Sequence, residues 1–383
     1  MTKQVKYLTI SDVHLGHKRN TTIEIIKNLN IYFDHYKPTS QFTDLDILFI
    51  AGDLFDTLLD NEGSGEVHEI LIWLDRLMRF CGNHGIKLRI LEGTPSHDWR
   101  QSKLAATLHH INAHDTCLDF RYIETAYIEF LKDLELYILY VPDEFSPSPD
   151  MTLNHVQSLM KDLNINQVDI ACMHGAFSWQ LRNAPSHIQR HSEEAYLSIV
   201  KHFVNIGHVH NFSTYDRLLA QGSFDRLSHG EEEPKGGILC DIRGPHGDSF
   251  NFIENKGAKI FKTITLRTLD LDKCIQQISK ATLKIPNDSY VRIKAVKTHP
   301  IYVAFDDLKM KFPMFHLSKI SLDDEDISEA KETLIVDTDV YTPVSITDTN
   351  IVDLLMNEVR SKYNLSDSQL TLLTGLLEQT NVK

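Results

Sequence analysis

Short apolar segments alternate with longer amphipathic stretches through about residue 257, and this alternation most constrains the fold of the chain. A β-rich run followed repeatedly by a helical one predicts a layered α/β domain. The expected strands are Tyr7–Ile10, Ile47–Ala51, Leu88–Leu91, Leu136–Val141, Val168–Met173, Phe203–Ile206 and Gly237–Ile242. Helices are expected between them, for example at Thr22–Tyr36 and Glu66–Cys81.

The rest of the chain divides into two further parts. Expected strands at Lys259–Leu269 and Tyr290–Val296, separated by an amphipathic stretch at Asp272–Thr282, predict a small α+β domain over residues 258–340. Residues 341–383 are expected to form a linker and a helical tail, with helices at Asp348–Tyr363 and Ser366–Thr380. Two short helices bury little apolar surface, so they either pack on the body or bind a partner.

Composition limits the classes of function. The net charge is −14, from 53 acidic and 39 basic residues, so any DNA contact has to be local or assisted by bound cations or a partner. Five scattered cysteines without a C-x-x-C pair indicate reduced thiols. Neither a signal-peptide core nor an apolar run of the ~18–20 residues needed for a membrane span is present. We therefore expect a cytoplasmic protein with no membrane contact.

Residue types that ligate metals follow five of the expected strands. The five segments are Asp12-Val13-His14, Gly52-Asp53-Leu54-Phe55-Asp56, Ser96-His97-Asp98, Met173-His174-Gly175 and Gly207-His208-Val209-His210. Residues two apart in an extended segment point the same way, so Asp12 with His14 can aim at one centre, as can His208 with His210. The carboxyl ends of the strands form the ligand crevice of α/β sheets. Mixed carboxylate and imidazole ligation suits Mn, Fe or Zn.

Asp53 is the natural bridge of such a site. One carboxylate can hold two cations roughly 3.5–4 Å apart, which is the spacing of two-metal hydrolytic sites. A single motif of this kind is also typical of a structural histidine near a strand end. All five motifs, each following a strand, predict a metal centre.

In this order the motifs resemble those of the calcineurin-like metallophosphoesterases, which are D-x-H, G-D-x-x-D, G-N-H-D, H and G-H-x-H. Ile10–Gly16 and Gly52–Asp56 are similar to the SbcD branch, the nuclease subunits of SbcC–SbcD type DNA-repair complexes and of phage recombination nucleases. The stretch Gly222–Gly236 resembles the G-S-x-x-R…E…K-G pattern of that branch. The motif resemblance covers residues 1–240, and beyond them it depends on domain layout alone.

The resemblance implies a metallophosphoesterase β-sandwich flanked by helices over residues 1–257, a capping domain that binds DNA, and a tail that docks on an SbcC-like coiled-coil ATPase. It also implies a homodimer and two Mn²⁺ ions per chain, with Mg²⁺ as the alternative. One ion would be held by Asp12, His14, Asp53 and His210. The other would be held by Asp53, His174 and His208. His97 would lie beside the scissile phosphate as a catalytic residue, with Asp98 orienting its ring.

One motif departs from the family pattern. Where the family has G-N-H-D, this chain has Gly93-Thr94-Pro95-Ser96-His97-Asp98, so the asparagine that ligates the second metal is absent. Ser96 precedes the histidine, and its shorter hydroxyl predicts weaker binding at the second metal position.

Basic residues near the motifs are candidates for contacts with the DNA backbone. They are Lys18, Arg19, Arg182, Arg190 and Lys201. For each of them, an ordinary solvated surface charge is the alternative interpretation.

The sequence thus predicts a metal-dependent DNA nuclease of an SbcC–SbcD type repair or recombination complex, in a bacterial cell or a phage-infected host. The resemblance implies 3′ to 5′ exonuclease action on duplex ends and endonuclease action on single strands. Two alternatives stay open. One is a phosphatase or cyclic-nucleotide phosphodiesterase on the same scaffold, and the other is a weakly active scaffold subunit.

Overall fold

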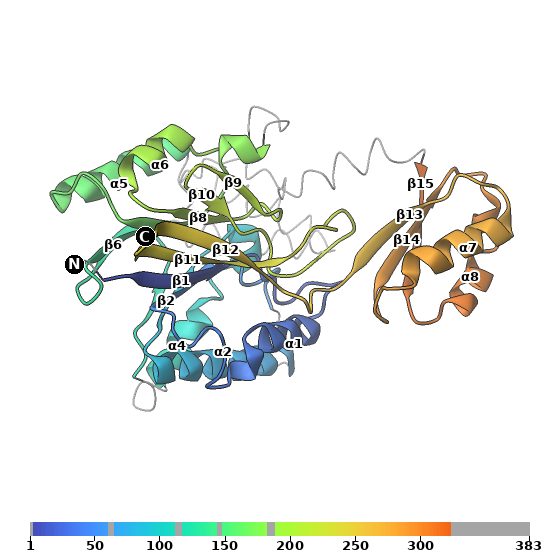
Figure 1. The fold of residues 1–383 in the computed structure, drawn as a ribbon, viewed down its shortest axis with the longest axis horizontal. Coiled ribbons are helices and arrows are strands. Elements are labelled where there is room, and N and C mark those ends of the chain that lie inside the picture. Colours follow the sequence, from blue (N-terminus) through green and yellow to red (C-terminus); the bar gives the residue numbers. More distant parts are fainter. Residues whose placement is uncertain (1–2, 60–64, 112–116, 144–147, 182–187, 323–383) are drawn as a thin grey trace, which may run out of the picture. The chain divides into compact units, whose positions relative to one another are not determined.

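A computed structural model describes residues 3–59, 65–111, 117–143, 148–181 and 188–322. Two six-stranded mixed sheets pack face to face, and helices cover their outer surfaces (Figure 1). The predicted α/β class is confirmed. No helix within these described ranges is long and apolar enough to cross a membrane.

The first sheet contains the N-terminal strands. Its order is β12 (Gly247–Glu254), β11 (Gly236–Gly244), β1 (Val5–Ile10), β2 (Ile47–Ala51), β3 (Lys87–Leu91) and β4 (Phe120–Ile123). Strands β1 to β4 are parallel, whereas β11 pairs antiparallel with both β1 and β12. Its outer face packs on α1 (Thr22–Tyr32), α2 (Gly65–His84) and α4 (Lys103–Ile111).

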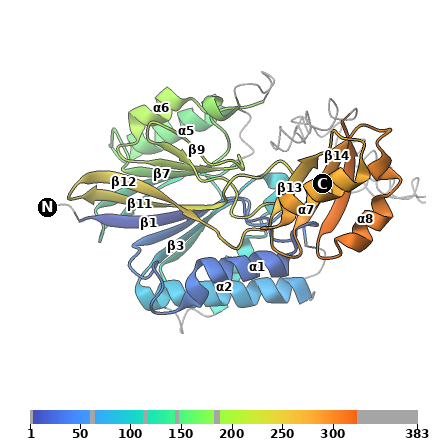
Figure 2. The same ribbon diagram turned by 45° about the vertical axis from the view of Figure 1, so that its right-hand side comes forward.

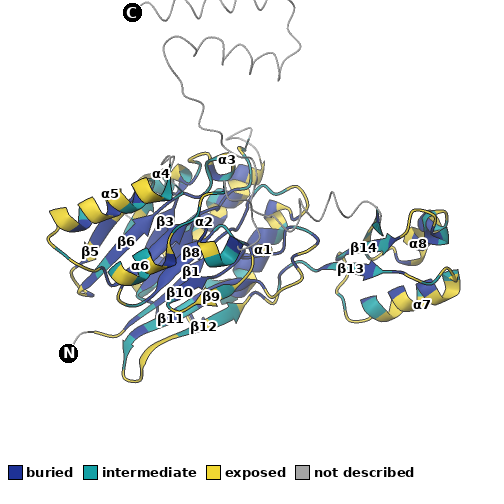
Figure 3. Cartoon of the chain, turned by 90° about the horizontal axis from the view of Figure 1, so that it is seen from above, coloured by how far each residue is buried: buried dark blue, intermediate teal, exposed yellow. Residues whose placement is uncertain are grey.

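The second sheet also has six strands, most of them parallel. Its order is β5 (Tyr127–Leu131), β6 (Leu136–Val141), β7 (Ile170–His174), β8 (Val204–Gly207), β10 (Leu218–Ala220) and β9 (Ser213–Tyr215). Strands β6, β7, β8 and β10 are parallel. Its outer face is covered by α5 (Pro149–Asp162) and α6 (Glu193–Ile199). Thr152, Val156 and Met160 recur every fourth residue and form the buried side of α5, whose other side is exposed (Figure 3).

The two sheets are joined by apolar side chains and by one buried ion pair. Tyr7 and Phe49 of the first sheet pack with Tyr140 of the second in a shared core. Within that core, the Arg89 guanidinium on β3 donates two hydrogen bonds of 2.9 Å to the Glu129 carboxylate on β5. The Tyr140 hydroxyl donates to the same carboxylate at 2.7 Å. Every charge of this pair is therefore satisfied inside the protein.

A third sheet follows in the chain and has its own core (Figure 2). It consists of the parallel strands β13 (Phe261–Thr265), β14 (Tyr290–Ala295) and β15 (His316–Ser321), with helices α7 (Leu271–Thr282) and α8 (Phe305–Lys311). The Asp270 carboxylate caps α7 by accepting from the backbone N–H groups of Asp272 and Lys273. The predicted helical tail, residues 341–383, lies outside the described residues.

Some elements differ from the sequence prediction. The helix expected at Thr22–Tyr36 ends at Tyr32, and a short 3₁₀ turn with His35 at φ 54° follows it. Strand β12 was not predicted, because its side chains are exposed or half-buried and it lacks an apolar run. Four of the five cysteines are buried and all are free thiols, as expected, and Cys117 is exposed.

Candidate metal centre

The loops after parallel strands of both sheets meet at one place. Strands β1, β2 and β3 lead into this place from the first sheet, and β6, β7 and β8 lead into it from the second. The structure brings together all six residues predicted as firm metal ligands: Asp12, His14, Asp53, His174, His208 and His210. All are buried except His208, which is half-buried.

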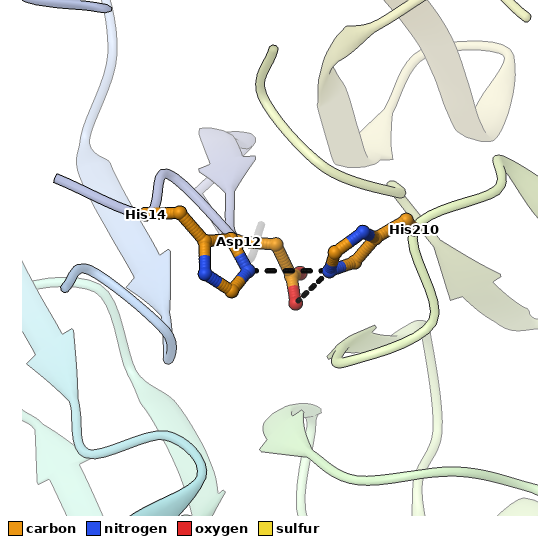
Figure 4. A group of neighbouring side chains, drawn as sticks. All are labelled: Asp12, His14 and His210. Carbon is orange, nitrogen blue, oxygen red and sulfur yellow. Dashed lines mark hydrogen bonds and ion pairs between the residues drawn. The ribbon is translucent and has the colours of Figure 1, made fainter. Parts of the chain in front are cut away.

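The first cluster contains Asp12 and His14 from the loop after β1 and His210 from the loop after β8 (Figure 4). The Nε2 atoms of the two histidines face each other at 3.2 Å, and the His210 Nε2 lies 3.8 Å from the Asp12 carboxylate. On the other side of each ring, Nδ1 faces a carboxylate. For His14 this is Asp56 at 3.1 Å, and for His210 it is Glu231 at 3.2 Å.

These ring contacts favour a cation in the first cluster. An imidazole whose Nδ1–H donates to a carboxylate presents a lone pair on Nε2. Two such lone pairs 3.2 Å apart repel each other unless a positive charge lies beside them. Burial lowers the pKa of His210, but the carboxylates of Glu231 and Asp12 together more than offset this and raise it, so the surroundings of the ring favour a positive charge. The donor set of one carboxylate and two imidazoles therefore fits a transition-metal ion.

The second cluster contains Asp53 from the loop after β2, His174 at the end of β7 and His208 after β8. The His174 Nε2 lies 3.2 Å from Asp53 Oδ1, and its Nδ1 faces the carbonyl of Ala51 at 2.7 Å. The Thr94 hydroxyl lies among the three residues, 3.3 Å from Asp53 Oδ2, 3.3 Å from His174 Nε2 and 3.2 Å from His208 Nδ1.

Asp53 connects the two clusters, because its two oxygens face different histidines. Oδ1 lies 3.2 Å from the His174 Nε2, and Oδ2 lies 3.9 Å from the His14 Nε2. Burial alone would raise the pKa of Asp53, but the surrounding histidines, His174 above all, hold it well below its usual range. Asp53 therefore stays ionised, as a bridging ligand has to be.

The two histidines of the second cluster differ in their proton affinity. Burial lowers the pKa of His174, yet the charges of Asp53 and other acids raise it to about 10. In the metal-free protein, a proton on His174 thus neutralises Asp53. Burial and the neighbouring His174 lower the pKa of His208 to about 4, so His208 is neutral and ready to donate a lone pair.

The backbone of the clusters is held in unusual conformations. Four of the six residues lie at positive φ: Asp12 at 51°, His14 at 54°, Asp53 at 49° and His208 at 98°. Such conformations cost on the order of 1 kcal/mol each and are typical of functional sites. Backbone hydrogen bonds hold them, including those from Val13 N and His14 N to the carbonyl of Asp53 at 2.8 and 3.1 Å.

One glycine allows the loops to approach each other. A Cβ on Gly93 would lie 2.0 Å from the backbone nitrogen of Asp53, so only glycine lets the loop after β3 lie against Asp53. This close approach places Thr94 in the second cluster.

His97 lies beside the first cluster, with its ring 5.0 Å from that of His14. Its orientation differs from the expectation, because its Nδ1 faces the backbone carbonyl of Asp56 at 2.8 Å. The two oxygens of Asp98 instead accept the backbone N–H groups of Phe55 at 2.8 Å and Gly93 at 2.7 Å. Asp98 thus fixes the loops after β2 and β3, and the structure does not support its expected role of orienting the His97 ring.

Two residues of the site were missed by the sequence analysis. Thr94, and not Ser96, supplies the hydroxyl of the second cluster, whereas the Ser96 carbonyl accepts from the Trp99 indole at 2.7 Å. Asp143 follows β6 and interacts with Thr94, His174 and Asp53; burial raises its pKa to about 6. Its position directly after the correctly predicted strand Leu136–Val141 was the signal that could have found it.

The structure describes four of the five basic residues that were predicted to contact DNA. Lys18 and Arg19 are exposed, while Arg182 lies outside the described residues. Arg190 lines a cavity of about 170 Å³ that Asp143 and His208 also line. Lys201 pairs with Asp169 at 3.1 Å.

Glu231 holds the ring of His210. It is buried between His210 Nδ1 at 3.2 Å and the buried Lys235 ammonium at 3.0 Å, and Lys235 also donates to the His210 carbonyl at 2.8 Å. This gives a structural reason for the E…K-G pattern in Gly222–Gly236. The positive charges of His210 and Lys235 outweigh the effect of burial and lower the pKa of Glu231 well below its usual range.

Replacing Glu231 by glutamine should weaken metal binding at the first cluster. The amide no longer enforces the Nδ1–H tautomer of His210 by charge, and losing such a partner typically lowers metal affinity 10–100-fold. Titration calorimetry with Mn²⁺ measures the loss. Glu233→Gln, the same change at an exposed position two residues on, is the control and should bind as the wild type does. Equal affinities for both variants would contradict the role assigned to Glu231.

Comparisons with known proteins leave the family open. No family model matches the chain, and no curated protein matches it significantly. One solved structure, of a protein without a stated name, aligns with a TM-score of 0.38 and 14% identity over 66% of this chain and 100% of its own. A protein of unknown function from Aquifex aeolicus, AQ665, aligns with a TM-score of 0.23 and 18% identity over 44% of this chain and 76% of its own.

Proposed function

We propose that the chain is a two-metal phosphodiesterase that cleaves DNA, with Mn²⁺ as the preferred ion. The observation that carries this proposal is the bridging position of Asp53, whose two oxygens face separate clusters of buried ligands. A pair of bound cations supplies a water of lowered pKa and neutralises the charge that develops on phosphorus. Asp12, His14, Asp53 and His210 would hold one ion, and Asp53, His174 and His208 the other.

His97 is the proposed proton carrier. Its contact with the Asp56 carbonyl fixes the ring beside the first cluster. From there, a proton on the imidazole can pass to the leaving oxygen or stabilise its charge. Asp56 contacts His14 through its side chain and His97 through its carbonyl, so it fixes the orientation of both rings.

DNA is the proposed substrate because of the motifs in residues 1–240, which resemble those of the SbcD branch. Within them, the Gly222–Gly236 stretch lies against the candidate centre through Glu231 and Lys235. The same proposal includes the metallophosphoesterase sandwich fold, action at double-strand ends, the ATPase partner and the homodimer. A phosphatase or cyclic-nucleotide phosphodiesterase on the same scaffold is the alternative that the experiment has to separate.

Linear duplex DNA and a chromogenic phosphodiester should be tested with Mn²⁺, Mg²⁺ or EDTA. We expect Mn²⁺-dependent DNA degradation that His97→Ala lowers by about 10²–10⁴-fold. His155→Ala, which removes an exposed histidine from α5, should match the wild type. Cleavage of the chromogenic ester alone would favour the phosphodiesterase alternative. If both activities persisted in EDTA, the proposal would be overturned. If neither substrate were cleaved, even with an SbcC-like ATPase added, the scaffold alternative would be favoured.

A further inference from the structure

We infer that Thr94 supplies an oxygen ligand to the second cation and that Asp143 is its positioning residue. This inference depends on the proposed function, because it concerns the second of the two proposed ions. The family pattern would give this position to Ser96, whereas the structure gives it to Thr94, two residues earlier in the chain. The structure also adds a carboxylate that no motif contains.

The Thr94 hydroxyl lies beside all three other ligands of the second cluster, at the separation expected between ligands of one ion. Its oxygen lies 3.2–3.3 Å from an atom of each predicted ligand, namely Asp53, His174 and His208. The backbone N–H of the same residue donates to Asp53 Oδ1 at 2.5 Å, which fixes its position relative to the bridge. Threonine hydroxyls bind divalent cations in other phosphate-handling sites, so the residue type suits this role.

Asp143 is placed to accept a hydrogen bond from the Thr94 hydroxyl. Strand β6 runs parallel to β7 with Val141 opposite Met173, so the residues after β6 emerge beside His174. Asp143 lines the same cavity as His208, and its carboxylate interacts there with the Thr94 side chain. A hydroxyl has one proton and two lone pairs. Here the hydroxyl donates to Asp53 Oδ2 at 3.3 Å. With a cation bound to Asp53, the proton would turn to Asp143, which leaves the lone pairs for the position between Asp53, His174 and His208.

The charge of the second cluster supports the same assignment. The first cluster has Asp12 in addition to the shared Asp53, and carboxylates lie behind both of its histidines. The second cluster has only the shared Asp53, and its His174 ring faces a backbone carbonyl and not a carboxylate. Asp143 supplies the missing negative charge close to a divalent ion.

The geometry also separates Thr94 from Ser96. Gly93 lies directly against Asp53, so the next residue in the chain reaches the carboxylate. Ser96 lies further along the chain, in α3 (Pro95–Asp98), where its carbonyl accepts from Trp99. A direct comparison of substitutions at the two positions therefore tests the inference.

The test is the number and coupling of bound Mn²⁺ ions in the full chain. Calorimetry gives the stoichiometry, and electron paramagnetic resonance distinguishes a spin-coupled pair from an isolated ion. Thr94→Val keeps the shape but removes the hydroxyl, and should weaken the second ion 10–100-fold and abolish the coupled signal. Thr94→Ser should retain both ions, and so should Ser96→Ala. Asp143→Asn should weaken the second ion and leave the first unchanged, whereas Asp150→Asn, at an exposed position in α5, should change neither.

The outcomes separate this inference from the proposed function. If the wild type binds a coupled pair and Thr94→Val binds it equally well, the inference is wrong and the proposed function stands. Loss of the pair in Ser96→Ala but not in Thr94→Val would return the role to Ser96. A wild type that binds no pair would overturn both proposals. Circular dichroism of the metal-free variants verifies that each of them is folded.

Discussion

Replacing Asp53 by asparagine should lower Mn²⁺-dependent phosphodiesterase activity by at least about a thousandfold. The Asp53 carboxylate faces both clusters, so on the proposed function its loss would weaken both ions at once. Metal stabilisation of transition-state charge amounts to several kcal/mol, and about 4 kcal/mol corresponds to a factor of about a thousand in rate. Asparagine is the suitable replacement because Asp53 lies at φ 49°, a conformation that asparagine also tolerates.

The measurement is the steady-state rate on DNA and on the chromogenic ester, together with the Mn²⁺ stoichiometry. Asp162→Asn, the same change at an exposed position at the end of α5, is the matched control and should retain full activity. Activity of Asp53→Asn within tenfold of the wild type would show that Asp53 does not bridge catalytic ions.

Removing Glu129 should destabilise the fold by about 3 kcal/mol, the lower end of the range for breaking a buried ion pair, because Glu129→Ala removes the main partner of the buried Arg89 guanidinium and leaves it only Asp119 as a carboxylate partner, at 2.8 Å. Arg89 is fully buried on β3, and Glu129 lies opposite it on β5, so the pair connects the two sheets. The Tyr140 hydroxyl, which donates to the same carboxylate at 2.7 Å, also loses its acceptor. The free energy of unfolding in urea is the quantity to measure.

Two controls test the physical reason for this loss. Glu24→Ala removes an exposed ion pair with Lys27 and should change the free energy of unfolding by less than about 1 kcal/mol. Glu129→Gln keeps hydrogen-bond acceptors but loses the charge, and should fall between the two alanine variants. If Glu129→Ala and Glu24→Ala had equal effects, burial of the Arg89–Glu129 pair would not be what stabilises the contact between the sheets.

The strand bounds that could be predicted best are those of strands buried on both faces. Ile47–Ala51 and Leu136–Val141 were predicted with their observed bounds, because continuous apolar runs are typical of parallel strands covered on both sides. Strand β12 was missed because it lies at the edge of its sheet and its side chains are mostly exposed or half-buried. Strand β5, also at an edge, alternates polar and apolar residues only briefly and was missed as well.

In the candidate site, the residues that could be predicted lie directly after buried strands, and those that were missed depend on how a loop bends. The aspartates and histidines that follow the buried strands could be found from their spacing in the sequence, and the structure brings them together. Thr94 could not, because its place depends on the close packing of Gly93 against Asp53, and this contact joins loops far apart in the sequence. Asp143 was missed because an aspartate after Val-Pro is also typical of an ordinary turn.

Both clusters take side chains from the two sheets: the first joins the loop after β1 to the loop after β8, and the second joins the loop after β2 to β7 and β8. On the proposed function, each ion therefore also cross-links the sandwich. An ion at a hundredfold excess over its dissociation constant adds about 2.7 kcal/mol to the free energy of unfolding. The lifetime of the protein in a cell would then follow the manganese supply, since copies without metal unfold and are degraded more readily. Metal scarcity would limit the amount of nuclease as well as its activity, without any separate regulatory domain.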